Sequence, residues 1–100
     1  GGSTPVRELL GHDAALLQNF PNPFSRATTI PVTLHSGGYI DLSIFDAQGR
    51  PVETLLKGEY PAGDYRLEFR ADGLPAGIYY ARLSTPAAVL SRRLIFAGAH

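Results

Sequence analysis

Cysteine, methionine and tryptophan are absent from this 100-residue chain. Without cysteine there can be no disulfide framework and no thiolate metal site, although this does not identify the compartment. An excess of charge is lacking too: nine basic and nine acidic residues give a formal net charge of zero. A phosphate backbone or an anionic bilayer is therefore a poor candidate ligand, and we expect no nucleic-acid partner.

Long apolar runs are also missing. No stretch approaches the roughly 18 apolar residues of a membrane span, and the start lacks the basic-then-apolar pattern of a signal peptide. If the domain is exported, we expect its signal to lie on a larger parent chain.

The residue groupings of an enzyme are not found either. His12, His35 and His100 stand in a linker, at a strand end and in a tail, without metal-ligand spacing. No serine stands in a nucleophile-elbow pattern, and Gly37-Gly38 is too short for a phosphate loop. We therefore expect no catalytic residue, no cofactor and no metal, and hence no enzyme.

The chain does contain tight turns that lead into strands whose side chains alternate between two faces, most clearly in residues 74–83. Pro75 and Gly77 suit the second and fourth positions of a type I turn. Arg82 makes its own face of the following strand the solvent side, so the opposite face should be the core. In immunoglobulin-like sandwiches a tyrosine near the start of the sixth strand bonds back to nearby backbone, and Tyr79 is our candidate. The predicted core side is Tyr79, Ala81 and Leu83, and the predicted outer side is Ile78, Tyr80 and Arg82.

Two earlier segments alternate in the same way. Residues 28–35 carry apolar side chains at every second position, but Pro31 cannot donate a ladder hydrogen bond, which predicts an edge strand or a bulge. Residues 36–38 form a turn signal, and residues 40–45 alternate again, so these two strands are predicted to form a hairpin. Before them, Phe20 and Phe24 are expected to anchor a proline-rich segment across the end of the core.

The second half of the chain predicts three more strands. Residues 51–60 have an irregular pattern typical of a short strand, and residues 65–69 alternate after a Pro-Ala-Gly turn like the one at 75–77. We interpret the similarity of the two turns as the same turn chemistry used twice. The last strand, 88–96, should place Leu90, Leu94 and Phe96 on the core side, interrupted by Arg92, with Arg93 and Ile95 on the other side.

Short strands separated by turn signals, without a helical period, predict an all-β fold. We expect an immunoglobulin-like antiparallel β-sandwich of about seven strands over residues 16–97. Residues 1–15 are predicted to be a flexible linker or expression remnant, and residues 98–100 a frayed tail.

An outward face is the predicted interaction site. In such a sandwich the third, sixth and seventh strands are neighbours, so their outward apolar side chains would form one patch edged by arginines. Aromatic residues and arginine are enriched in protein interfaces. The alternatives are that a linker covers these residues or that they are scattered surface, and that the arginine pair is only solubilising. The patch comprises Tyr39, Phe45, Ile78, Tyr80, Val89 and Ile95 with Arg82 and Arg93, and partner-binding is assigned to Tyr39, Phe45, Tyr80, Arg82, Arg92 and Arg93.

Several motifs together resemble the type A C-terminal sorting domain of the type IX (Por) secretion system. They are Asn-Phe-Pro-Asn-Pro-Phe at 19–24, Thr-Thr-Ile at 28–30, Phe-Asp-Ala-Gln-Gly-Arg-Pro-Val at 45–52, Pro-Ala-Gly at 61–63, Gly-Leu-Pro-Ala-Gly-Ile-Tyr-Tyr at 73–80 and a basic pair before Leu-Ile-Phe at 94–96. The sequence departs from the family at 25–26, where Ser-Arg replaces the frequent Asn-Pro, and at 97–100, which extend past the usual last strand.

The resemblance implies a non-catalytic module at the C-terminus of a larger exported enzyme or adhesin. Such a module is read by the outer-membrane secretion and sorting machinery, and the cargo commonly stays on the surface of a Gram-negative bacterium after the domain is cut away. The family is also similar in fold to the immunoglobulin-like domain of flagellar hook-capping proteins. Two other functions stay open: a carbohydrate-binding module whose aromatic side chains stack on a polysaccharide, and a structural spacer.

Overall fold

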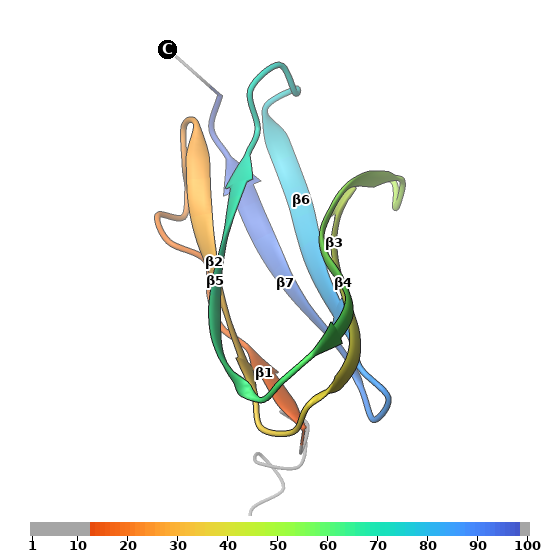
Figure 1. The fold of residues 1–100 in the computed structure, drawn as a ribbon. Coiled ribbons are helices and arrows are strands. Elements are labelled where there is room, and N and C mark those ends of the chain that lie inside the picture. Colours follow the sequence, from red (N-terminus) through yellow and green to blue (C-terminus); the bar gives the residue numbers. More distant parts are fainter. Residues whose placement is uncertain (1–12, 99–100) are drawn as a thin grey trace, which may run out of the picture.

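The computed structural model describes residues 13–98, which form two antiparallel β-sheets packed face to face (Figure 1). One sheet has the order β1-β2-β5 and the other the order β4-β3-β6-β7. The predicted seven-stranded all-β sandwich is confirmed, as is the adjacency of the third, sixth and seventh strands. The strands are β1 (Ala14–Leu16), β2 (Ala27–Leu34), β3 (Gly38–Asp46), β4 (Pro51–Tyr60), β5 (Gly63–Arg70), β6 (Gly77–Ser84) and β7 (Val89–Phe96).

The core lies between the two sheets and is built from alternate residues of each strand, because successive side chains of a strand point to opposite faces. The predicted inward side of β6 is buried, while Ile78, Tyr80 and Arg82 are exposed. On β7, Leu94 and Phe96 are buried and Leu90 is half-buried, as predicted. The buried apolar residues are Ala14, Leu16, Phe24, Ile30, Val32, Leu34, Ile40, Leu42, Ile44, Phe69, Ala71, Tyr79, Ala81, Leu83, Leu94 and Phe96.

The predicted hairpin between residues 28–35 and 40–45 is wrong. β2 pairs with β1 and β5, whereas β3 pairs with β4 and β6, so the short connection through Gly37 crosses from one sheet to the other. Both strands present one apolar face to the same core, as the alternation of apolar and polar residues predicts. Alternation identifies the buried face of a strand but does not identify its hydrogen-bonding neighbour.

The prediction of an edge strand or a bulge at Pro31 is also wrong, since β2 is the central strand of its sheet and pairs with β1 and β5 without a register shift. β1 ends at Leu16, which pairs with Val32, and the carbonyl of Pro31 accepts a hydrogen bond from the amide of Leu17, 3.0 Å away. In an antiparallel ladder one residue directs its N–H and C=O to the same neighbour. The missing N–H of Pro31 therefore faces Leu17, just past the end of β1, and takes no hydrogen bond from the pairing of β2 with β5.

Two other segments differ from the sequence-based expectation. β1 begins at Ala14, which is buried, so residues 14 and 15 of the expected linker belong to the sandwich. β4 is a ten-residue strand rather than a short one, and its pairing with β3 shifts register after Leu42 and after Ile44. Such bulges interrupt the alternation of side chains between the two faces, by which a strand is recognised in the sequence. Residues 1–12 of the expected linker and residues 99–100 of the expected tail lie outside the described residues.

The proline-rich segment 19–24 closes the seam between the two sheets. Phe24 is buried and forms a parallel bridge with Phe96. The amide of Phe24 donates to the carbonyl of Ile95 at 3.0 Å, and the carbonyl of Phe24 accepts from the amide of Ala97 at 2.8 Å. Phe24 thus anchors the segment across the core as predicted. Phe20 does not, because half of its surface is exposed (50%).

Candidate functional site

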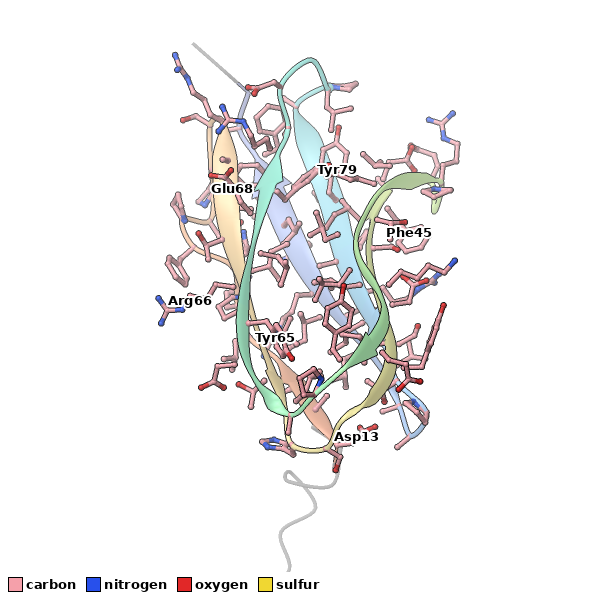
Figure 2. All side chains as sticks on the ribbon, viewed as in Figure 1. Asp13, Phe45, Tyr65, Arg66, Glu68 and Tyr79 are labelled. Atoms are coloured by element: carbon pink, nitrogen blue, oxygen red, sulfur yellow. The ribbon has the colours of Figure 1, made fainter. Side chains whose placement is uncertain are left out.

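The predicted interaction face is the outer surface of the β4-β3-β6-β7 sheet. One cross-strand row joins Phe45, Tyr80 and Arg93, and the next row toward the end of the sheet joins Ile78 and Ile95. Tyr80 and Ile78 are 38% and 39% exposed. Figure 2 shows Phe45 projecting from this side of the sandwich and Arg66 from the opposite side. These five residues form a contiguous surface, which we call the β6 face.

Arg82 borders the β6 face and stacks on it. Its guanidinium carbon lies 4.0 Å from the centroid of the Phe45 ring, a cation–π geometry that fixes the orientation of the charged group. Beside this pair is a hollow of about 210 Å³ lined by Phe45, Asp46, Ala47, Gly49, Tyr80, Arg82 and Ser91. Aromatic, cationic and hydroxyl-bearing residues therefore line one small surface pocket, together with Asp46.

Tyr39 and Val89 lie away from the β6 face, although the sequence analysis grouped them with it. Both are exposed, at 49% and 63%. Tyr39 precedes Phe45 by six residues on β3, a distance of about 20 Å in an extended strand. Val89 lies opposite Ser84 at the far end of β7. The expected single patch is thus divided between the two ends of the sheet.

The two adjacent arginines of β7 have different surroundings. Arg93 is exposed and belongs to the β6 face, whereas Arg92 is half-buried on the inner side. The Nε of Arg92 donates to the carbonyl oxygen of Leu16 at 2.9 Å. Because Leu16 is on β1 and Arg92 on β7, this bond joins the open edges of the two sheets.

Replacing the two arginines separately should therefore give different results. Arg92→Gln should lower the free energy of unfolding by about 1.5–3 kcal/mol, the range for hydrogen bonds from charged groups. Arg93→Gln should change it by no more than about 0.5 kcal/mol, because the side chain is exposed. Urea denaturation of both variants measures the difference, and equal losses would contradict the bridging role of Arg92.

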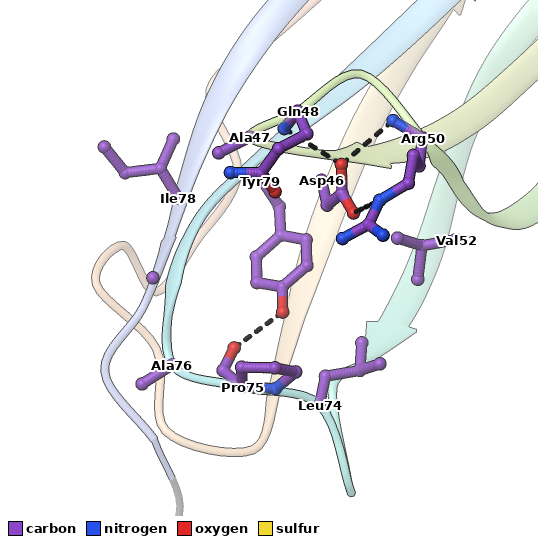
Figure 3. Close-up of a pocket in the computed structure, with 11 residues that line it drawn as sticks. Asp46, Ala47, Gln48, Arg50, Val52, Leu74, Pro75, Ala76, Ile78 and Tyr79 are labelled. Carbon is purple, nitrogen blue, oxygen red and sulfur yellow. Dashed lines mark hydrogen bonds and ion pairs between the residues drawn. The ribbon is translucent and has the colours of Figure 1, made fainter.

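A second hollow of about 270 Å³ lies at the end of the sandwich, around Tyr79 and Asp46 (Figure 3). The Tyr79 hydroxyl donates to the carbonyl oxygen of Pro75 at 2.6 Å, which is the bond back to upstream backbone that the sequence predicts. Burial raises the pKa of the Tyr79 phenol, and the charge of Asp46 raises it further. The stability from this buried phenol is therefore present below its ordinary pKa of 10.0 and is lost as the pH rises through the higher pKa of the folded state.

The carboxylate of Asp46 is hydrogen-bonded to residues of the turn that follows it. Its carboxylate accepts from the amides of Gln48 and Arg50, at 3.0 and 2.9 Å, and from the Nε of Arg50 at 2.9 Å. The backbone amide of Arg50 is the main cause that holds the pKa of this carboxyl below its ordinary value. The Asp46 carboxylate thus stabilises the turn between β3 and β4.

Tyr79 has a matched counterpart in Tyr65, whose hydroxyl donates to Pro61 at the same 2.6 Å but in an exposed position. Tyr79→Phe should cost about 0.5–1.5 kcal/mol, because the lost hydrogen bond is partly shielded from water. Tyr65→Phe should cost less than about 0.5 kcal/mol, since water can replace the hydroxyl. Chemical denaturation checks this, and similar losses in both variants would contradict a special role for Tyr79.

Comparison with known proteins identifies the family. The family model described as the secretion system C-terminal sorting domain matches residues 18–97. The chain belongs to this family. No curated protein and no solved structure gave a significant match. Membership confirms the resemblance to a C-terminal sorting domain of the type IX secretion system. It supports a sorting role in that system, which implies interaction with the secretion machinery and a parent protein and secretion via the outer membrane.

The sorting domain uses two asparagines that the sequence analysis did not single out. Asn19 is buried, and its Nδ2 donates to Thr28 Oγ1 at 2.9 Å, while that hydroxyl donates to the carbonyl of Pro21 at 2.8 Å. Asn22 Oδ1 accepts from the amide of Ile95 at 2.9 Å. The available signal for both asparagines is the Asn-Phe-Pro-Asn-Pro-Phe motif at 19–24, and a buried asparagine such as Asn19 needs hydrogen-bond partners. The 19–24 and 28–30 motifs are therefore used within the fold.

Catalysis has no support in the sorting domain. Members of the family are in general non-catalytic. Among residues 13–98, histidine, aspartate and glutamate form no group of three that could hold a metal ion. In the same part of the chain, no helix is long and apolar enough to cross a membrane.

Proposed function

We propose that this domain directs the export of a larger parent protein, attached on its N-terminal side, and leads to anchoring of that protein at the cell surface. The observation that carries the proposal is the family match over residues 18–97, which spans every strand from β2 to β7. The domain itself carries out no reaction and acts by being bound.

The β6 face with Arg82 is the surface we assign to recognition. In the family motifs at 19–24 and 28–30, the side chains of Asn19, Asn22 and Thr28 form hydrogen bonds within the fold and Phe24 is buried, so these groups are poorly available to a partner. The β6 face is different because its aromatic and arginine side chains reach the surface without a core role. Interface hot spots are enriched in tyrosine and arginine.

A reporter fusion tests the sorting function. The intact domain, fused to the C-terminus of a periplasmic reporter in a host with the type IX system, should direct the reporter to the medium or cell surface. Tyr80→Ala should reduce that export while the melting temperature of the purified domain stays close to that of the parent. Arg66→Gln, on the outer side of the other sheet, is the matched control and should export normally. A reporter retained in the periplasm by the intact domain would refute the proposal.

A carbohydrate-binding role predicts a different result. Sugar-stacking sites need accessible aromatic ring faces close together, but here Arg82 covers one side of Phe45 and Tyr39 lies at the other end of its strand. We therefore expect no sedimentation with xylan or cellulose above that of a control protein. Binding to either polysaccharide that Tyr80→Ala abolishes would favour the carbohydrate-binding function.

A further inference from the structure

The β6 face carries positive charge that the described residues leave unpaired. β6 and β7 contain Arg82, Arg92 and Arg93 but no aspartate or glutamate. The three ion pairs within residues 13–98 involve Arg50 and Arg70 only. Of the neighbouring carboxylates on β3, Asp46 is bonded to Arg50, and Asp41 accepts the Ser43 hydroxyl at 2.6 Å. Arg82 and Arg93 thus have no carboxylate partner in this part of the chain.

The arrangement of the two arginines favours the binding of a negatively charged group from another molecule. Arg82 lies opposite Ser91, and Tyr80 opposite Arg93, so the two arginines are diagonal neighbours on adjacent strands. Diagonal positions are about 7–8 Å apart at the Cα atoms, close enough for like charges to repel. A carboxylate bound between them would remove that repulsion.

Arg82 is oriented to receive such a group. Its guanidinium carbon lies 4.0 Å from the centroid of the Phe45 ring, and this contact holds the charged group beside the hollow. A planar carboxylate can accept two guanidinium N–H groups at once. The Ser91 hydroxyl lines the same hollow of about 210 Å³, which gives a second donor and room for one side chain.

We propose that the β6 face docks a protein segment that presents a carboxylate side chain beside an apolar one. The carboxylate binds Arg82 in the hollow, with Arg93 nearby, and the apolar side chain covers Tyr80, Ile78 and Ile95. This inference rests on the proposed function, since the segment would belong to the secretion machinery. A protein is favoured over a polyanion because only two unpaired arginines flank an apolar strip and the whole chain has no net charge.

The binding chemistry can be tested without the secretion machinery. The probe is a fluorescein-labelled, capped peptide in which glutamate alternates with phenylalanine, compared with the same peptide carrying glutamine for glutamate. By fluorescence anisotropy the glutamate peptide should bind about tenfold more tightly, as expected for one added charge-assisted hydrogen-bonded pair. Its affinity should fall as salt is raised, because the arginines are exposed to solvent.

Variants then locate the site. Arg82→Gln should remove the preference for the glutamate peptide, and Arg93→Gln should weaken it, while Arg66→Gln on the opposite face should leave it unchanged. Equal affinity for both peptides, or an undiminished preference in Arg82→Gln, would overturn the inference. Tighter binding to phosphatidylglycerol vesicles than to the glutamate peptide would overturn it in favour of a lipid surface.

The export assay separates this inference from the sorting function. With the reporter fusion, Arg82→Glu should reduce export more than Arg82→Gln, because a negative charge would repel the partner's carboxylate. If the intact domain exports the reporter and both variants export equally well, the sorting function stands and the carboxylate-docking inference fails. If the intact domain does not export the reporter, the sorting function fails, whatever the peptide measurements give.

Discussion

A chain that ends at Ser91 should not fold. It loses nine residues, among them Leu94 and Phe96, which are buried, and the segment of β7 that pairs with Phe24. Burial of each large apolar side chain contributes about 1.5–3 kcal/mol, and typical domains have a net stability of only about 5–15 kcal/mol. The truncation also leaves the backbone of residues 77–81 on β6 without its partner strand. Circular dichroism and urea titration should show no cooperative unfolding.

The matched control is a chain that ends at Ala97. It keeps all of β7 and the hydrogen bond from the Ala97 amide to the Phe24 carbonyl at 2.8 Å, so it should unfold cooperatively, like the parent. A cooperative transition in the chain ending at Ser91 would contradict the role of β7 in the core. An export defect in that truncation would carry no information about recognition, since an unfolded domain presents no surface.

Phe24→Ala should destabilise the domain more than the substitutions of Arg92 or Tyr79. Phe24 is buried, with its ring centroid 5.2 Å from that of Phe96 and 6.1 Å from that of Phe69. Replacing a buried phenylalanine by alanine removes the transfer energy and leaves a cavity, at a cost of about 3–5 kcal/mol. The cavity would open where one segment closes the seam between both sheets, so contacts from β5 and β7 are lost together. Urea denaturation of the purified domain measures the loss.

Phe20→Ala is the control from the same motif. Phe20 is 50% exposed, so its removal should change the free energy of unfolding by no more than about 0.5 kcal/mol. A loss in Phe20→Ala as large as that in Phe24→Ala would mean that the whole motif, rather than one buried ring, closes the sandwich.

These two results bear on how the domain is recognised. If Phe24 is indispensable for the fold, an export defect in a Phe24 variant reports unfolding rather than a lost contact with the machinery. Substitutions on the β6 face avoid this ambiguity because Tyr80, Arg82 and Arg93 are exposed. Export should therefore be compared among variants of this face whose melting temperatures are equal.

The sequence alone predicts β2 to β7 as strands and the buried side of most of them, whereas β1 was assigned in large part to the linker. The alternation in residues 30–34, 40–44 and 79–83 placed the correct residues in the core, because the two faces of a strand alternate residue by residue. The bond from Tyr79 to upstream backbone could also be predicted, since it depends on residues close together in the chain. The family was predicted from motifs whose order spans most of the chain, and the family match bears this out.

Which strands are neighbours depends on the packing of the whole chain. The side-chain period is the same whether β2 pairs with β3 or with β5, and for this reason the hairpin was predicted wrongly. The edge strand or bulge at Pro31 was predicted from its missing N–H, but β1 ends before the position that this N–H would face. The same limit applies to the site: Arg92 bonds to Leu16, 76 positions earlier in the chain, and Tyr39 lies far from Tyr80. Contacts between distant segments depend on register and on the packing of one sheet against the other, which no local pattern records. The buried side of a strand follows from neighbouring residues in the sequence. The contacts that a residue makes between the two sheets depend on how the sheets pack together.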